Sequence, residues 1–212
     1  MEEALKLKVH KTVVSNPKIA LNCPLSDKEK IQKIAHHFEN IMETLGLDLN
    51  DDSLKGTPLR VAKMYVQEIF SGLDPKNKPS ISLFKNTYGY QKLLVEKDIT
   101  LYSYCEHHFV PIIGKAHVAY IPRDKVIGLS KINRIVQYYA KKPQVQERLT
   151  LEISNALKEI LQHEDVAVYL EADHLCVAAR GIKDTQSKTI TAQYSGQFEH
   201  AEIKQEFLSY IH

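Results

Sequence analysis

The pattern of apolar positions begins with a helix. Ser26 and Glu29 carry the sequence signature of a capping box, and apolar residues then recur every three or four positions until Gly46. Because that spacing places them on one face, a helix is expected from about 27 to 45. A second helix is expected from Thr57-Pro58, a cap followed by a first-turn proline, to Gly72.

Further helices and several strands are expected in the rest of the chain. Apolar residues at helical spacing cover 129–142, and Pro143 breaks this helix and begins another that continues to about Gln162. The tail from about Glu199 is expected to be a short final helix. Other segments are rich in β-branched and aromatic residues or alternate in polarity, which predicts strands over 93–96, 99–104, 114–121, 166–172 and 189–198.

This order of elements indicates the fold class. Strands, two long helices and then strands again are typical of an α+β fold, in which an antiparallel sheet has helices packed on one face. Here a helical N-terminal part precedes that fold, and the prolines between Asp74 and Pro79 mark a linker. The chain is therefore expected to divide into a loosely attached arm over 1–25, the helical part over 26–79 and a larger domain over 80–212.

Composition narrows the class of protein. Apolar residues make up 43% of the chain, and the net charge of +2 is too small to favour a nucleic acid as partner. No segment approaches the length of a membrane span, and Met1-Glu2-Glu3 lacks the basic start of a signal peptide. The three cysteines make no disulfide framework. We therefore expect a cytoplasmic protein with no membrane partner, in which Cys23 is an incidental thiol.

Two short blocks gather cysteine and histidine. Cys105-Glu106-His107-His108 has a C-x-x-H spacing, which lets both ends of a tight turn reach one metal ion, and His174-Leu175-Cys176 follows some seventy residues later. If the second block is an extended strand, His174 and Cys176 project to the same face, so one can bind the metal while the other stands beside it as a catalytic base. The number of residues available fits one zinc ion held by three protein ligands.

Other interpretations of these blocks stay open on the residues alone. Cys105 and Cys176 could be buried apolar thiols, or a disulfide in an exported chain. A structural zinc would need a fourth protein ligand, which His107 or His174 could supply. Three ligands and an open fourth position would instead indicate a catalytic metal.

A candidate anion site lies elsewhere in the sequence. Gly128-Leu129-Ser130-Lys131 places a hydroxyl cap and a lysine at a helix start, where free amides favour phosphate. Arg134 one turn on, and Arg180 after the second block, could add charge, although each basic residue alone is more often simply solvated. The sequence contains no G-x-G-x-x-G, no P-loop and no G-x-S-x-G, so dinucleotide, P-loop and hydrolase-elbow functions lack support.

Taken together, these motifs resemble a known enzyme family. The similarity is to GTP cyclohydrolase I of the zinc-dependent type, and it extends from about residue 27 to 210, so only the N-terminal arm falls outside it. The motifs that carry it, in order, are Cys105-Glu106-His107-His108-Phe109, Tyr120-Ile121-Pro122, Gly128-Leu129-Ser130-Lys131-Ile132-Asn133-Arg134, Gln144-Val145-Gln146-Glu147-Arg148, and His174-Leu175-Cys176 with Arg180-Gly181.

The resemblance implies a tunnelling fold, a toroidal homodecamer with sites at subunit boundaries, and conversion of GTP and water to formate and 7,8-dihydroneopterin triphosphate. It implies that Cys105, His108 and Cys176 hold Zn²⁺, with His107 and His174 as catalytic histidines that bind no metal. The residues implied to contact GTP are Gln146 and Glu147 at the guanine edge and nearby ribose, and Ser130, Lys131, Arg134, Arg180 and Arg60 at the ribose triphosphate.

The chemistry of that reaction suits these residue types. Attack on C8 of a purine needs hydroxide near neutral pH and a protonated N7, which a metal and a histidine can supply, and we assign proton transfer to His174. Later proton shuttling falls to His107 and Ser130. A carboxylate at Glu147 suits guanine, because N1-H and the exocyclic amine are adjacent donors.

Two rival functions are a nucleotide-binding module of this fold with a structural zinc and no turnover, and a related pterin or deazapurine enzyme such as a nitrile reductase. The second leaves the C-x-x-H block without an explanation.

Overall fold

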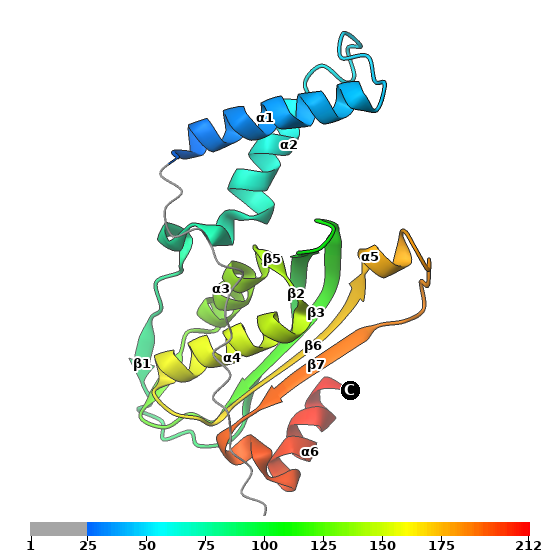
Figure 1. The fold of residues 1–212 in the computed structure, drawn as a ribbon. Helices are drawn as coiled ribbons and strands as arrows, with labels where there is room; N and C mark the ends of the chain where they lie inside the picture. Colours follow the sequence, from blue (N-terminus) through cyan, green and yellow to red (C-terminus); the bar gives the residue numbers. More distant parts are fainter. Residues whose placement is uncertain (1–24) are drawn as a thin grey trace, which may run out of the picture.

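The computed structural model describes residues 25–212 and begins with a helical N-terminal part. Helix α1 spans Asp27–Thr44, and Ser26 and Glu29 form the expected capping box. The expected arm over 1–25 lies almost entirely outside the described residues. In Figure 1 this helical part stands apart from the sheet, at the end where β2, β3 and α5 meet.

The second predicted helix, expected to run unbroken to Gly72, is divided into three pieces. Helix α2 covers Thr57–Lys63, a π-helical segment η1 covers Met64–Ile69, and a short 3-10 turn η2 covers Ser71–Leu73. The cap is Gly56 and not Thr57, whose hydroxyl instead accepts a hydrogen bond from Arg60. Another 3-10 turn, η3 at Pro75–Asn77, lies in the expected linker.

Close packing explains why a glycine ends this region. A Cβ at Gly72 would lie 2.2 Å from the carbonyl oxygen of Tyr138 and 2.7 Å from that of Lys141. The Gly72 amide donates a hydrogen bond to the same Lys141 oxygen at 2.9 Å. The helical N-terminal part is thereby joined, backbone to backbone, to the end of a helix in the larger domain.

The larger domain contains a five-stranded sheet in the order β5-β2-β3-β6-β7. The pairs β2–β3, β3–β6 and β6–β7 are antiparallel, as expected, and the short β5 pairs with β2 in parallel. The strands are β2 (Leu94–Cys105), β3 (Pro111–Tyr120), β5 (Pro143–Gln144), β6 (Val166–His174) and β7 (Thr189–Tyr194).

Three details differ from the sequence-based expectation. The two strands expected over 93–96 and 99–104 are one strand, β2, with an irregularity at Asp98, whose φ is 58°. Asp98 takes a turn-like conformation without ending the strand. A two-stranded ribbon of β1 (Leu83–Lys85) and β4 (Lys125–Ile127) was not predicted. Pro143 begins no helix, because Pro143 and Gln144 form β5.

Helices cover the sheet unequally. Helices α3 (Leu129–Ala140) and α4 (Gln146–Leu161) pack on one face, where they enclose the main core (Figure 1). The C-terminal helix α6 (Ala201–Ile211), which follows the 3-10 turn η4 (Gly196–Glu199), packs on the opposite face. Neighbouring residues of one strand separate the two cores, because Val118 belongs to the first and Ala119 to the second.

The end of β6 also departs from prediction. The chain stays extended only to His174 and then turns into the one-turn helix α5 (Leu175–Ala178). The expectation that His174 and Cys176 share the face of a strand is therefore wrong, since Cys176 lies in that helical turn. Within residues 25–212, no helix has the length and apolar character that crossing a bilayer requires.

Candidate active site

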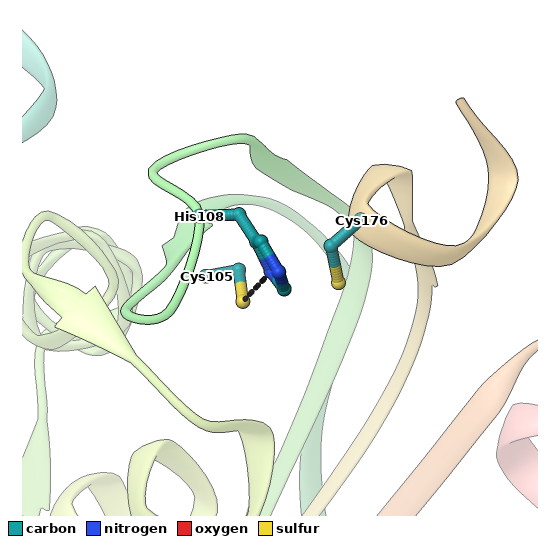
Figure 2. Close-up of side chains that lie close together, drawn as sticks. All are labelled: Cys105, His108 and Cys176. Atoms are coloured by element: carbon teal, nitrogen blue, oxygen red, sulfur yellow. Dashed lines mark hydrogen bonds between the residues drawn. The ribbon is translucent and has the colours of Figure 1, made fainter. Parts of the chain in front are cut away.

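The two cysteine and histidine blocks meet at one end of the sheet. Cys105 is the last residue of β2, and the turn after it carries His108 back over the thiol, while Cys176 approaches from α5 (Figure 2). The possible ligand atoms of Cys105, His108 and Cys176 all lie within 4.8 Å of one another. The Sγ of Cys105 is 3.7 Å from Nδ1 of His108. The three predicted ligands are thus close enough together to bind one ion.

Backbone hydrogen bonds shape the turn that brings these ligands together. The Phe109 amide donates to the Cys105 carbonyl at 2.8 Å, and the Cys105 amide donates to the Val110 carbonyl at 2.9 Å. Phe109 adopts a positive φ of 54°, which closes the turn. Its ring packs against Phe70 and Tyr65 at centroid separations of 5.0 and 6.3 Å, so the helical N-terminal part supports the turn from outside.

Both thiols in this group are free. Cys105 is buried and Cys176 is partly buried, and the structure contains no disulfide between them, which removes the disulfide alternative. Burial raises the pKa of the Cys176 thiol, and the neighbouring Cys105 raises it further. A bound cation would oppose that effect, because it favours the thiolate that metal binding requires. Two thiols and an imidazole are donor types that zinc prefers, so these residues fit the implied ion.

His107 lies beside the group without joining it. Its Nδ1 is 3.7 Å from the Sγ of Cys105, and its side chain is 62% exposed. The group of possible ligands among residues 25–212 contains Cys105, His108 and Cys176 and includes neither His107 nor His174. A structural zinc with four protein ligands therefore has no support from the arrangement of these side chains.

His174 is held by a buried glutamine. Its Nε2 lies 2.7 Å from Oε1 of Gln146, the first residue of α4, which is 2% exposed. The amide nitrogen of Gln146 donates to the carbonyl oxygens of Leu170 and Thr189 and to the hydroxyl of Thr191. Because all three are acceptors, the amide oxygen must face His174, which then donates from Nε2 and leaves Nδ1 free.

The electrostatic surroundings keep this imidazole mostly neutral at pH 7. Burial lowers the pKa of His174 below its ordinary value of 6.5, and the nearby carboxylates of Glu147 and Asp173 oppose the shift. Glu147 is exposed in the first turn of α4. The side chain of Gln146, by contrast, is turned inward and fully engaged with the sheet and His174.

Arg180 also reaches the site. Its Nη1 lies 3.0 Å from Nε2 of His108. It follows α5 directly, so the same short segment supplies both Cys176 and a guanidinium at the mouth of the site.

Two charged residues that were assigned no role in the sequence analysis, Glu106 and Arg148, also belong here. Arg148 of α4 donates a hydrogen bond to the carboxylate of Glu106, the residue between Cys105 and His107. The spacing of Gln144 and Arg148, four residues apart, could have suggested a contact between their side chains. Nothing in the sequence pairs either of them with Glu106.

The other predicted phosphate contacts lie away from the metal ligands. Ser130 and Lys131 are in the first turn of α3 and Arg134 is one turn further on, while Ala140 at the far end accepts a hydrogen bond from Ser103 of β2. At 1.5 Å per residue, Ser130 is about 15 Å along the helix from that contact. Gly128 caps α3, so the expectation of a Ser130 cap is wrong, although Ser130 is exposed in the first turn.

Arg134 and Arg60 are likewise on separate surfaces. Arg134 lines a cavity of about 340 Å³ together with Tyr138 and Lys141. Arg60 lies in α2, where its guanidinium donates to the Ser53 carbonyl and the Thr57 hydroxyl. A single chain therefore gathers the ligands, His107, His174, Gln146, Glu147 and Arg180, but does not add Ser130, Lys131, Arg134 or Arg60 to them.

Comparison with known proteins agrees with this arrangement. A family model described as GTP cyclohydrolase I matches residues 34–212. A protein named GTP cyclohydrolase 1 from Flavobacterium johnsoniae is 59% identical over 187 residues, which cover 88% of this chain and 84% of that protein. A protein of the same name from Aeromonas salmonicida is 54% identical, over 87% of this chain and 85% of that protein. Another from Haemophilus influenzae is 52% identical, over 86% of this chain and 84% of that protein. A crystal structure of the archaeosine synthase QueF-Like in the apo form covers 49% of this chain and 93% of its own, with 18% identity and a TM-score of 0.41, which is too low to support an inference.

Proposed function

Because this chain belongs to the GTP cyclohydrolase I family, we propose that Cys105, His108 and Cys176 form the metal centre of its active site. The chain is a hydrolase that opens the imidazole ring of GTP at C8, releases formate and forms 7,8-dihydroneopterin triphosphate, the first step of pterin and folate synthesis. The observation that carries the proposal is the convergence of two free thiols and an imidazole beside His174.

The metal we propose is zinc. When bound, a zinc ion supplies Lewis acidity that favours deprotonation of water near neutral pH. Cys105, His108 and Cys176 would hold it from β2, the following turn and α5. Thiols that must stay reduced in order to bind a metal suit a reducing compartment, which is consistent with the cytoplasmic location expected from the sequence.

His174 is proposed to deliver a proton to N7 of the purine, which carries none in GTP. The hydrogen bond from Nε2 to Gln146 fixes the orientation of the ring, so Nδ1 is the atom available to accept and return a proton. A mostly neutral imidazole can take a proton at Nδ1 from the attacking water and pass it to N7. His107, exposed beside Cys105, is proposed to shuttle protons in the later ribose rearrangement, with Ser130 as the other candidate.

Glu147 is proposed to recognise guanine. Its carboxylate is exposed at the start of α4, next to the glutamine that holds His174. Two carboxylate oxygens match the adjacent N1-H and amino donors of the base. Gln146 contributes by orienting His174, and its amide has no free donor to offer GTP while it bonds Leu170, Thr189 and Thr191.

The ribose triphosphate is proposed to bind Arg180 together with Ser130, Lys131, Arg134 and Arg60. Arg180 comes from the chain that supplies the metal ligands. Because Ser130 is about 15 Å along α3 from the end that contacts Ser103, two residues before Cys105, the remaining contacts are assigned to neighbouring copies. The complete site thus lies at a subunit boundary in this proposal.

Open edges of the sheet support an assembly of this kind. Among residues 25–212, β7 pairs with β6 alone, and β5 pairs with β2 only at Tyr104 and Cys105. Unpaired strand edges are ready to pair with another chain. On the sheet face that carries α6, the part beyond this helix exposes Tyr102, Ile113 and Ile190 at 54%, 37% and 55%. These features favour a closed homo-oligomer, for which the family resemblance suggests ten subunits.

An assay of formate tests the enzyme and its metal together. Purified protein incubated with GTP should release formate and a dihydropterin triphosphate, and a chelator should abolish both until zinc is returned. Cys176→Ser should lose bound zinc and activity, whereas Cys23→Ser should keep both. His174→Ala should keep zinc and lose turnover. A His174→Ala protein with normal turnover would instead favour a nucleotide-binding module with a structural zinc.

A further inference from the structure

We propose that Arg148 is a positioning residue for the metal centre, acting through Glu106, and that a buried chain of alternating charges holds it in place. This inference rests on the proposed metal site, and it assigns a purpose to side chains that are neither metal ligands nor proposed substrate contacts, although Oε1 of Glu106 lies 3.8 Å from Nε2 of His107. Arg148 and Glu106 come from α4 and from the turn after β2, so their contact ties the turn to a core helix.

The guanidinium of Arg148 is bonded on several sides. Its Nη2 donates to a carboxylate oxygen of Glu106 and to the carbonyl oxygen of Pro143, and its Nε donates to Oε1 of Gln144 at 2.9 Å. The side chain is only 11% exposed. An arginine bonded in this way has one orientation available, because its donors lie in a rigid plane.

Glu106 is the residue that this arginine restrains. Its amide donates to the carbonyl oxygen of Gln144 at 3.0 Å, so backbone and side chain are both attached to the segment that contains β5. Cys105 pairs with Gln144 in the sheet. The residue directly after one metal ligand, and two before another, is therefore fixed at two points.

Further buried charges hold the arginine. The amide nitrogen of Gln144, which is 1% exposed, donates to Oε2 of Glu152 at 2.8 Å. The same oxygen lies 3.8 Å from Nζ of Lys142, whose ammonium group is also within 4.6 Å of the centre of the Tyr139 ring. The charges along this chain thus alternate in sign, in the order Glu106, Arg148, Glu152 and Lys142. The neutral side chain of Gln144 links the Glu106–Arg148 pair to the Glu152–Lys142 pair.

If Arg148 acted only through its charge, removing it would change zinc binding in the opposite direction from the one expected of a positioning residue. A positive guanidinium near a cation site weakens metal binding by repulsion, so removing that charge would strengthen binding if nothing else changed. If Arg148 instead fixes the turn, removing it lets Cys105 and His108 leave their shared position, and binding weakens. Loss of a residue that supports metal ligands in this manner typically costs about 10- to 100-fold in metal affinity.

The test compares Arg148→Met, which removes the charge, with Arg148→Lys, which keeps the charge and loses the planar fork. Zinc affinity is measured by competition with a chromogenic chelator, and the absorption spectrum of the Co²⁺-loaded protein reports the geometry of the ligands. Both variants should bind zinc about 10- to 100-fold more weakly and shift the cobalt spectrum. Glu106→Gln, at a less buried position, covers the case in which an Arg148 variant fails to fold. Because losing a negative charge weakens cation binding by itself, this variant is judged by a shift of the cobalt spectrum, which reports the geometry of the ligands.

Arg123→Met is the matched control. Arg123 donates from Nε and Nη2 to the Asp165 carboxylate, so this variant also loses an arginine–carboxylate pair but leaves the metal turn intact. It should bind zinc like the unmodified protein. Thermal melting of each metal-free variant shows whether a general loss of stability accounts for weaker binding.

The outcomes separate the two proposals. Unchanged or tighter zinc binding in the Arg148 variants, or normal binding in Arg148→Lys, would overturn the positioning role. Weaker binding that is matched by Arg123→Met would overturn it too. If the unmodified protein itself binds no zinc, the proposed metal centre is wrong and the role of Arg148 falls with it.

Discussion

At the residue scale, the hydrogen bonds of the Gln146 amide nitrogen decide how its amide oxygen is used. Three acceptors hold its amide nitrogen, so only its oxygen is left for His174. That oxygen in turn takes the Nε2 proton of the imidazole and leaves Nδ1 for chemistry. A residue that sequence resemblance places at the substrate thus has a second way to affect turnover.

Replacing Gln146 with Leu should therefore lower the turnover of GTP while zinc stays bound. We expect turnover to fall by about 10- to 100-fold, as for other residues that orient functional groups, and less than in His174→Ala. Steady-state formate release and zinc content measure the two effects. Gln193→Leu, which changes a glutamine that bonds only the neighbouring Tyr194 carbonyl, is the control. Wild-type turnover in Gln146→Leu would show that His174 needs no such support.

His163 supplies a residue-scale prediction about pH. Its side chain is 3% exposed, its Nδ1 accepts a hydrogen bond from the Asp165 amide, and its Nε2 has no partner. Burial lowers the pKa of His163 below 6.5, and Asp165 only partly opposes the shift. The unfolded chain therefore binds more protons than the folded chain once the pH falls below about 6.5, so folding stability must decrease there.

The measurement is urea unfolding of metal-free protein between pH 7.5 and pH 5. Wild-type protein should lose stability through His163 with a slope of at most about 1.4 kcal/mol per pH unit. His163→Gln, which cannot titrate, should show a shallower dependence, and the difference should vanish above the ordinary pKa of histidine. Parallel curves for the two proteins would mean that His163 is protonated equally in both states.

At the scale of elements, the shortest pieces of structure position the site. The two-residue strand β5 sets α4 beside Cys105, and the one-turn helix α5 brings Cys176 over the same place. The long helices α3 and α4 supply the core that holds them. Sequence periodicity finds long elements well, but two to four residues contain too few positions for a period to be recognised.

The contact at Gly72 is the prediction that belongs to this scale. Gly72→Ala should push η2 away from the end of α3, because the added carbon would meet two backbone carbonyl oxygens that no side-chain rotation can move. We expect a loss of about 1–3 kcal/mol in the free energy of unfolding, measured by urea denaturation. Ser71→Ala, which loses one exposed hydrogen bond to Glu68, should cost less. Equal losses would show that the close approach at Gly72 relaxes freely.

The division at residue 79 remains a prediction. Gly72 joins the helical part to the end of α3, and the aromatic contacts of Phe70 and Tyr65 with Phe109 join it to the metal turn. These contacts favour action of the two parts as a unit.

At the scale of the whole molecule, the proposed site is incomplete in one chain. Metal ligands, His174 and Glu147 lie at one end of the sheet, and the start of α3 lies about 15 Å along its axis from the end nearest them. Unpaired edges at β7 and β2 offer a means by which copies could bring the two halves together.

Mixing two inactive variants tests this directly. In the proposed boundary site, one subunit supplies the metal ligands and its neighbour supplies phosphate contacts from α3. Cys176→Ser disables the first half of the site and Arg134→Ala disables the second, so a homo-oligomer of either variant should be nearly inactive. After dissociation and joint reassembly, a boundary site receives two intact halves in about a quarter of cases, so about a quarter of wild-type formate release should return. Light scattering before and after reassembly confirms that the oligomer has re-formed. No recovery in a re-formed oligomer would place the whole site within one chain.

Local periodicity in the sequence was enough to predict the fold class, the long helices and most strand positions. The two cysteine and histidine blocks indicated a metal site, and the family resemblance selected Cys105, His108 and Cys176 within them. The sequence pattern favoured a strand at Cys176 because the two residues after His174 are too few to show whether the chain stays extended or turns into a helix. The packing of the folded chain was needed to show that Gln146 holds His174, that Arg148 bonds Glu106 and that the start of α3 lies away from the metal ligands. Those relations join side chains distant along the chain, and they depend on how β5, α4 and α5 pack rather than on any local pattern.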